Sequence, residues 1–187
     1  MTELTRALLD LVQAFDRLAI PYAVMGGMAV RVYGIPRATY DIDFTAAIGL
    51  DRLGELFAAV LGLGYTVPEQ YESGWVDRVA GMPLVKFRRY LSGQGVDVDV
   101  FLAESPFQQQ LLARRRREHI EQTLVWFVSP EDLILLKLLA GRPRDIADVG
   151  DILFTQGQLD EKHLRRWAME LGLKSQLEQA LRDAANQ

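Results

Sequence analysis

The segment from Tyr22 to Phe44 limits the possible folds more than any other part of the sequence. Its apolar run from Tyr22 to Met25 is typical of a buried strand and leads directly into Gly26-Gly27. The apolar stretch from Met28 to Tyr33 predicts a helix immediately after the glycines, and the stretch from Tyr40 to Thr45 predicts a second strand. The chain should therefore form a strand, a glycine turn, a helix and a strand in that order.

The second of these strands carries Asp41 and Asp43, which share one face because side chains alternate along a strand. Two carboxylates a few ångströms apart raise each other's pKa unless a cation lies between them. The later stretch "VDVDVF" repeats the arrangement with Asp97 and Asp99, so an adjacent strand could add a third carboxylate. Carboxylate oxygens are the ligands that Mg²⁺ or Mn²⁺ prefers.

The glycine pair suggests a phosphate site beside this metal site. A strand that turns into a helix at Gly26-Gly27 directs free backbone N–H groups toward a ligand, and glycine lets a phosphate approach the backbone closely. Two divalent ions bridged by aspartates, with a triphosphate at a helix start, favour in-line attack at phosphorus. A lone Asp-x-Asp is most often a solvated sheet face, but the combination of elements in this order favours a functional site.

Composition excludes several other classes of site. The 187 residues include no cysteine and only two histidines, His119 and His163, so a metal must be held mainly by oxygen. The net charge of −4 argues against indiscriminate nucleic-acid binding, although Arg114 to Arg117 and Gly141 to Arg144 are basic islands. No apolar run is long enough to span a membrane, and the amphipathic start is unlike a signal peptide, so we expect a cytoplasmic protein without a membrane partner.

The remaining patterns predict a mixed sheet with interleaved helices, which places the chain in the α/β or α+β class. Ser129 is a predicted N-cap and Pro130 a first helical residue. From there the chain is predicted to be all helical, which suggests a domain of residues 1–128 and a helical region of residues 129–187 packed on it. The other predicted helices are Glu3–Leu18, Leu50–Leu61, Phe107–Arg117, Pro143–Phe154, Asp160–Glu170 and Ser175–Ala185; the other strands are Trp75–Val79, Leu84–Tyr90, Val96–Leu102 and Thr123–Ser129, with a turn at Gly81-Met82-Pro83.

The stretch "GGMAVRVYGIPRATYDIDF" resembles the nucleotidyltransferase superfamily, whose members share a palm domain of the polymerase-β type. The resemblance implies that Gly26 and Gly27 form the turn, that Asp41 and Asp43 are the metal-binding pair, and that Asp99 is the third acid. Asp97 is the alternative third acid.

The later stretch "SPEDLILLKLLAGRPRDIADVGDIL" resembles the AbiEii-type toxins and related stand-alone bacterial nucleotidyltransferases. Its matching residues are Lys137, Arg142, Asp145 and Asp148. Together the two resemblances cover about Tyr22 to Leu153. They imply a nucleoside triphosphate substrate, two Mg²⁺ or Mn²⁺ ions, and transfer of a nucleoside monophosphate with loss of pyrophosphate.

Roles for individual residues follow from this resemblance. Asp99 would help to deprotonate the acceptor hydroxyl, while Gly26-Gly27 would seat the β- and γ-phosphates. Lys137 would be a point charge on the triphosphate, or else a snorkelling lysine on an apolar helix. Arg37 would contact phosphate or face solvent. Thr39 and Arg142 complete the predicted nucleotide-binding residues.

Three other features each allow a structural interpretation. Asp145 and Asp148 could pair with Arg142 or Arg144 near the start of their helix. The cations of Arg114 to Arg117 could interact favourably with the negative end of a helix dipole, or they could bind an RNA backbone. Aromatic residues could stack on a base, although aromatics in strands usually belong to the core; they are Trp75, Tyr71 and Tyr90.

These observations favour a metal-dependent nucleotidyltransferase, and the first hypothesis is the toxin of a toxin–antitoxin pair that modifies tRNA or a partner protein. One alternative is a small-molecule transferase of the antibiotic-modifying type. The other is a catalytically silent palm that binds a nucleotide or a partner, as an antitoxin would.

Overall fold

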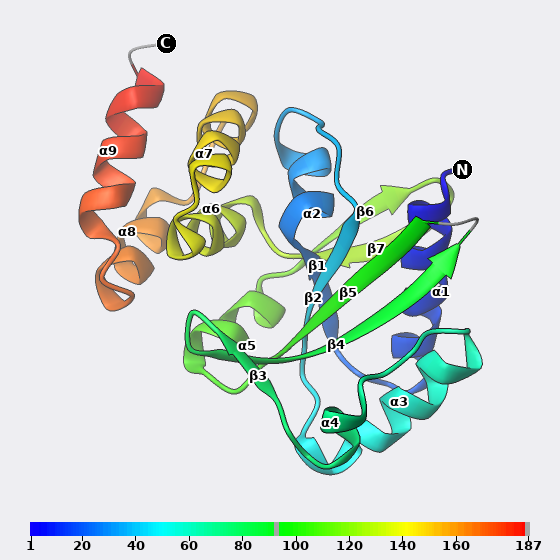
Figure 1. Cartoon of the computed structure of the whole chain (residues 1–187). Helices are drawn as coiled ribbons and strands as arrows, with labels where there is room; N and C mark the ends of the chain where they lie inside the picture. Colours follow the sequence, from blue (N-terminus) through cyan, green and yellow to red (C-terminus); the bar gives the residue numbers. More distant parts are fainter. Residues whose placement is uncertain (92–93, 186–187) are drawn as a thin grey trace.

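The computed structural model describes residues 1–91 and 94–185. Within them the strands form one seven-stranded sheet in the order β3-β4-β5-β2-β1-β7-β6 (Figure 1). Strand β2 runs parallel to β5, and β1 runs parallel to β7, whereas the other neighbours are antiparallel. The predicted mixed sheet and α/β class are therefore confirmed. The strands are β1 (Tyr22–Met25), β2 (Asp41–Ala46), β3 (Asp77–Val79), β4 (Met82–Leu91), β5 (Gln94–Leu102), β6 (Arg116–Ile120) and β7 (Thr123–Phe127).

The helices divide between the sheet and a group at one end of the molecule. Figure 1 shows α6 to α9 together on the side away from α1 and α3, with α2 between this group and the sheet. The helices are α1 (Glu3–Arg17), α2 (Gly26–Tyr33), the short 3-10 helix η1 (Leu50–Arg52), α3 (Leu53–Gly62), α4 (Glu69–Glu72), α5 (Pro106–Ala113), α6 (Pro130–Ala140), α7 (Pro143–Thr155), α8 (Glu161–Glu170) and α9 (Lys174–Ala185).

An aromatic cluster fixes which face of β2 points inward. The ring of Phe15 in α1 lies 5.2 Å from that of Tyr22 and 4.9 Å from that of Phe44, measured between centroids. Ile42 and Phe44 are fully buried on this face, and burying a side chain of this size stabilises the fold by roughly 1.5–3 kcal/mol. Because side chains alternate along the strand, Asp41 and Asp43 must point to the opposite face.

Helix α6 begins at a buried polar network. The hydroxyl of Ser129 accepts a hydrogen bond from the backbone N–H of Asp132, as the predicted N-cap requires. The carboxylate of Asp132 also lies 2.6 Å from Nε2 of His163, so this network ties α6 to α8. The helix is thus held firmly where it follows β7. The division of the chain at residue 128 stays a prediction.

The Arg114–Arg117 segment differs from its predicted helical state. Helix α5 ends at Ala113, and the strand β6 begins at Arg116 and pairs with β7. The predicted helix over Phe107–Arg117 is therefore wrong at its C-terminal end. Hairpin pairing with the apolar strand β7, which follows directly in the chain, overrides the local helical preference of arginine at this sheet edge.

Three predicted boundaries also change. Helix α2 begins at Gly26 rather than at Met28, so the glycine pair forms its first turn. Met82 and Pro83 belong to β4 and pair with β3, which leaves Ala80 and Gly81, both with positive φ, as the actual turn. Since β3 comprises only Asp77–Val79, the predicted strand from Trp75 is two residues too long at its start.

Candidate active site

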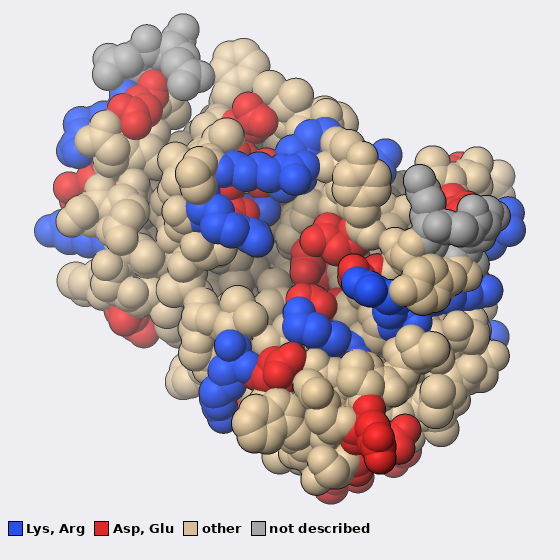
Figure 2. Space-filling model, viewed as in Figure 1, with Lys and Arg blue, Asp and Glu red and all other residues tan. Residues whose placement is uncertain are grey.

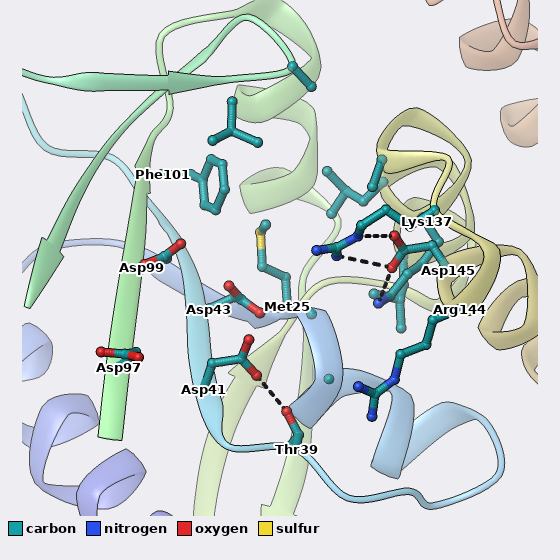
Figure 3. A pocket seen from close by; sticks show the side chains of 18 of the residues that line it. Met25, Thr39, Asp41, Asp43, Asp97, Asp99, Phe101, Lys137, Arg144 and Asp145 are labelled. Atoms are coloured by element: carbon teal, nitrogen blue, oxygen red, sulfur yellow. Dashed lines mark hydrogen bonds and ion pairs between the residues drawn. The ribbon is translucent and has the colours of Figure 1, made fainter. Parts of the chain in front are cut away.

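The register between β2 and β5 brings the two Asp-x-Asp pairs side by side. Asp41 lies opposite Asp97, and Asp43 lies opposite Asp99. Residues opposite each other in neighbouring strands point to the same face, so all four carboxylates line one pocket (Figure 3). The predicted meeting of a third carboxylate with the first pair is therefore seen in the strand register.

Asp43 is the most perturbed of these acids. Burial raises the pKa of its carboxyl group, and the negative charges of Asp41 and Asp99 raise it further, to about 7. Lys137 and Arg142 act in the opposite direction but only partly offset this effect. The side chain retains some accessible surface and lines the pocket together with the other acids. A cation close to this carboxyl group would stabilise its charged form.

The glycine turn closes tightly over these acids. Gly26 has a φ of +62°, and a Cβ at this position would lie 1.8 Å from Oδ2 of Asp43. A Cβ on Gly27 would lie 2.3 Å from the hydroxyl oxygen of Thr39, which itself donates a hydrogen bond to Asp41 at 2.6 Å. No side chain caps the start of α2. Gly26 is therefore required for its backbone conformation, and at both positions a side chain larger than hydrogen would not fit.

Lys137 stands on the opposite wall but is not a free cation. It is almost fully buried, and its Nζ lies 2.8 Å from Asp145 and 2.8 Å from Asp148. The lysine therefore does not snorkel to solvent. For both aspartates, burial raises the pKa, but hydrogen bonds from Lys137 and a neighbouring arginine outweigh it, so the pKa of each carboxyl group lies below its usual value.

Three arginines complete this wall. Arg37 donates two hydrogen bonds to Asp148, at 2.6 and 2.7 Å, so it does not simply face solvent. Arg142 donates to Asp145, as the structural interpretation of this motif predicts, while Arg144 instead donates to the carbonyl of Ala38. The loop before β2 is thus fastened to the start of α7.

The two walls enclose a pocket of about 720 Å³. Figure 2 shows acidic side chains at the centre of this hollow, with basic side chains on both sides. One end of the pocket is apolar and lies between the sheet and α6 (Figure 3). Its apolar lining includes Met25, Met82, Phe101, Leu133 and Leu136. The pocket therefore offers acids, cations and an apolar surface next to one another.

The sequence reasoning did not single out Lys86 and Arg88 of β4. Lys86 contacts Asp99 at 2.8 Å, and Arg88 donates to both carboxylate oxygens of Asp97. A signal was present, because cations alternate in "KFRRY" as the acids do in "VDVDVF". Only the antiparallel pairing of β4 with β5, however, shows which cation meets which acid.

The carboxylate oxygens of this pocket fit a divalent cation, although two of the acids contact other side chains in this structure. Asp41, Asp43 and Asp99 supply oxygen ligands of the type that Mg²⁺ and Mn²⁺ prefer, and burial together with mutual repulsion raises the pKa of Asp43. Among residues 1–91 and 94–185, no three acidic or histidine side chains are arranged as a metal site. Thr39 donates a hydrogen bond to Asp41, and Lys86 forms an ion pair with Asp99.

The arginines of the basic island bind within the protein. Arg115 and Arg117 each lie 4.5 Å from the ring centroid of Trp126. Arg114 and Arg116 form ion pairs with the buried Glu131. These contacts support the structural interpretation of the island over an RNA-binding strip.

The aromatic residues named from the sequence lie in different environments. Tyr71 is buried and donates a hydrogen bond to Asp77 at 2.6 Å. Trp75 also donates to Asp77, but more than half of its surface is exposed, and Tyr90 is likewise exposed. Tyr71 is therefore a core residue, and none of the three lines the pocket with the acids.

Several solved structures share the fold of this chain. An antigenic nucleotidyltransferase-like protein from Paracoccidioides brasiliensis is 24% identical, with a TM-score of 0.56 over 96% of this chain and 92% of that chain. ANT(2")-Ia in complex with adenylyl-2"-tobramycin is 20% identical, with a TM-score of 0.52 over 99% and 97%. The lincosamide antibiotic adenylyltransferase LnuA, bound to lincomycin, is 15% identical, with a TM-score of 0.53 over 83% and 99%. The fold is that of the nucleotidyltransferases.

A narrower assignment comes from the sequence family. The model described as nucleotidyl transferase AbiEii toxin, type IV toxin–antitoxin system, matches residues 6–185. The chain therefore belongs to this family and is a nucleotidyltransferase, which confirms the resemblance seen in its motifs. A search of curated proteins gives no significant match. Among the described residues, no helix is long and apolar enough to cross a membrane.

Proposed function

We propose that the protein transfers a nucleoside monophosphate from a nucleoside triphosphate to an acceptor hydroxyl, with release of pyrophosphate. The observation that carries this proposal is the in-register parallel pairing of β2 with β5, which puts Asp99 beside Asp43 and Asp97 beside Asp41. Clustered acids that repel one another raise the cost of folding, so their presence in one pocket supports a role that needs a cation.

Asp41, Asp43 and Asp99 would hold divalent ions, which supply Lewis-acid stabilisation of the charge that develops at phosphorus. Asp99 also serves as the base that accepts the proton of the attacking hydroxyl. The first turn of α2, at Gly26 and Gly27, binds phosphate oxygens through its backbone N–H groups.

The basic wall binds the triphosphate and keeps it in place. Arg142 and Arg144 line the pocket and are largely exposed, so their guanidinium groups are accessible to phosphate oxygens. Lys137 acts mainly as a buried charge, because Asp145 and Asp148 already bind its ammonium group. Thr39 and Arg37 position Asp41 and the loop before β2. Water is excluded on the apolar side by Met25 and its neighbours.

We infer that the acceptor is tRNA or a partner protein and that the chain is the toxin of a pair controlled by a cognate antitoxin in the cytoplasm. The family description supports the toxin role. Exposed arginines at the pocket support an acceptor that carries phosphates. Arg114 and Arg116 already form ion pairs with Glu131, so the basic island supports an RNA acceptor less than the sequence suggested.

A small-molecule acceptor is the second candidate. It is favoured by the apolar end of the pocket next to Phe101 and by the likeness of fold to LnuA and ANT(2")-Ia, whose structures contain lincomycin and adenylyl-2"-tobramycin. A silent binding module is disfavoured, because such a protein has no reason to retain repelling acids.

The test is to incubate the purified protein with each labelled nucleoside triphosphate, Mg²⁺ or Mn²⁺, and either total bacterial RNA, cell extract, or lincosamide and aminoglycoside antibiotics. The control is Asp41→Asn with Asp43→Asn. Label in RNA or in a protein band that disappears in the control supports the first candidate. Label in an antibiotic supports the second. Metal-dependent nucleotide binding without transfer to any acceptor would refute both and favour a binding module.

A further inference from the structure

Lys86 contacts one of the three acids that are assigned to metal binding in the proposed reaction. Its Nζ donates a hydrogen bond to Oδ2 of Asp99 at 2.8 Å, from the position directly opposite in the antiparallel pair of β4 and β5. The side chain of Lys86 is 43% exposed and that of Asp99 25% exposed, and both line the pocket. This contact faces the same space that a metal ion and a nucleotide would enter.

The neighbouring pair of Arg88 and Asp97 shows how the Lys86 contact differs. Arg88 donates from both Nε and a terminal nitrogen to the two oxygens of Asp97, which is a bidentate arrangement with fixed geometry. Lys86 makes a single contact from a flexible stem that carries a point charge. Asp97 is therefore held by Arg88 through two hydrogen bonds, whereas Asp99 loses a single contact when it separates from Lys86.

Release of Asp99 is what assembly of the metal site requires. In this structure Asp99 is bound to Lys86, Asp41 accepts a hydrogen bond from Thr39, and no three acids among the described residues converge as metal ligands. Without Lys86, the carboxylate of Asp99 would lose this ion pair and still face the negative charge of Asp43. The ammonium group of Lys86 thus places a positive charge next to Asp99, while Lys137 and Arg142 act on Asp43.

We propose that Lys86 is a positioning residue that acts as a releasable latch: its ammonium group holds Oδ2 of Asp99 until a divalent cation competes for the same carboxylate. This inference rests on the proposed metal-dependent function. It also identifies Asp99, rather than Asp97, as the third metal-binding acid. The latch keeps the metal-free site stable and makes metal binding weaker than the acids alone would allow.

The test measures Mn²⁺ binding without nucleotide, from the loss of the electron paramagnetic resonance signal of free Mn²⁺. Lys86→Met removes the latch, and we expect the dissociation constant to fall about fivefold, the equivalent of about 1 kcal/mol. Lys86→Gln is a second variant in case the first is misfolded. Arg88→Met is the matched control, because it removes a cation from the same strand and face, and we expect a change of less than about twofold.

Lys86→Arg separates the latch from a simple effect of charge. A guanidinium group at this position keeps the charge but can hold Asp99 through two hydrogen bonds, so the latch predicts weaker Mn²⁺ binding than in the wild type. A pure charge effect predicts no change. In an Asp99→Asn background, the latch also predicts that Lys86→Met loses its effect, because there is no carboxylate left to release.

The outcomes distinguish failure of the latch from failure of the proposed function. Mn²⁺ binding that Asp43→Asn abolishes, with no change in Lys86→Met, would overturn the latch alone. A larger effect in Arg88→Met than in Lys86→Met would overturn it in favour of Asp97 as the third acid. Wild-type protein that binds no Mn²⁺, up to millimolar concentrations, would refute the metal-dependent function and the latch with it.

Discussion

Replacing Lys137 by methionine should destabilise the protein, because this lysine neutralises two buried acids. Its Nζ lies 2.8 Å from both Asp145 and Asp148, whose side chains are 2% and 1% exposed. Methionine fills a similar volume, so the change removes the charge without leaving a large cavity. The variant therefore tests the charge itself.

The expected cost follows from the contacts that are lost. A hydrogen bond to a charged group contributes roughly 1.5–3 kcal/mol, and Lys137 makes two such contacts. The loss is partly offset because the ammonium group no longer has to be buried, and because each acid keeps an arginine: Arg142 on Asp145 and Arg37 on Asp148. We expect the free energy of unfolding to fall by about 3 kcal/mol, a large part of the total for a domain of this size.

The assay is urea unfolding followed by circular dichroism, with Lys162→Met as the control. Lys162 is an exposed lysine of α8, so its replacement should change stability by less than about 0.5 kcal/mol. A loss below about 1 kcal/mol in Lys137→Met would refute the reasoning. If such a stable variant had also lost activity, Lys137 would act directly on phosphate rather than as a buried counter-charge.

Three further predictions rest on single sites. The pKa of the Asp43 carboxyl group is raised to about 7 in the folded protein, so its contribution to stability is complete below the unfolded value of about 4 and is lost as pH rises toward 7. In urea unfolding at several pH values, Asp43→Asn should remove this loss of stability. An unchanged dependence of stability on pH would count against the raised pKa. Gly26→Ala should lower stability and nucleotide binding, because the backbone has a positive φ and the added Cβ would clash with Asp43. Gly150→Ala in α7 should instead raise the melting temperature and stabilise the protein by about 0.5–1 kcal/mol, because no atom lies within 4 Å of the added Cβ. Arg117→Gln should lower stability by about 0.5–1 kcal/mol through its contact with Trp126 but leave nucleotide transfer to RNA unchanged; a selective loss of transfer would restore the RNA-binding interpretation.

Local patterns in the sequence predicted most of the elements that build the site. The strand over Tyr22–Met25, the Asp-x-Asp strand and the capped helix after Ser129 all depend on residues close together in the chain, so alternation, apolar spacing and capping residues were sufficient. The same patterns failed at Arg116, where hairpin pairing with β7, rather than the helical preference of the residues themselves, decided the conformation.

By itself the sequence therefore determined the kinds of residue at the site: two acidic pairs on strands, a glycine turn that tolerates a close approach, and a helix that carries Lys137. The tertiary structure alone decided their partners. The register of β2 against β5 joins Asp43 to Asp99, and the packing of α7 joins Asp148 to both Lys137 and Arg37. The pairings of Asp43 with Asp99 and of Arg37 with Asp148 span long stretches of chain. Such contacts depend on the position of the whole backbone, which no local pattern of residues encodes.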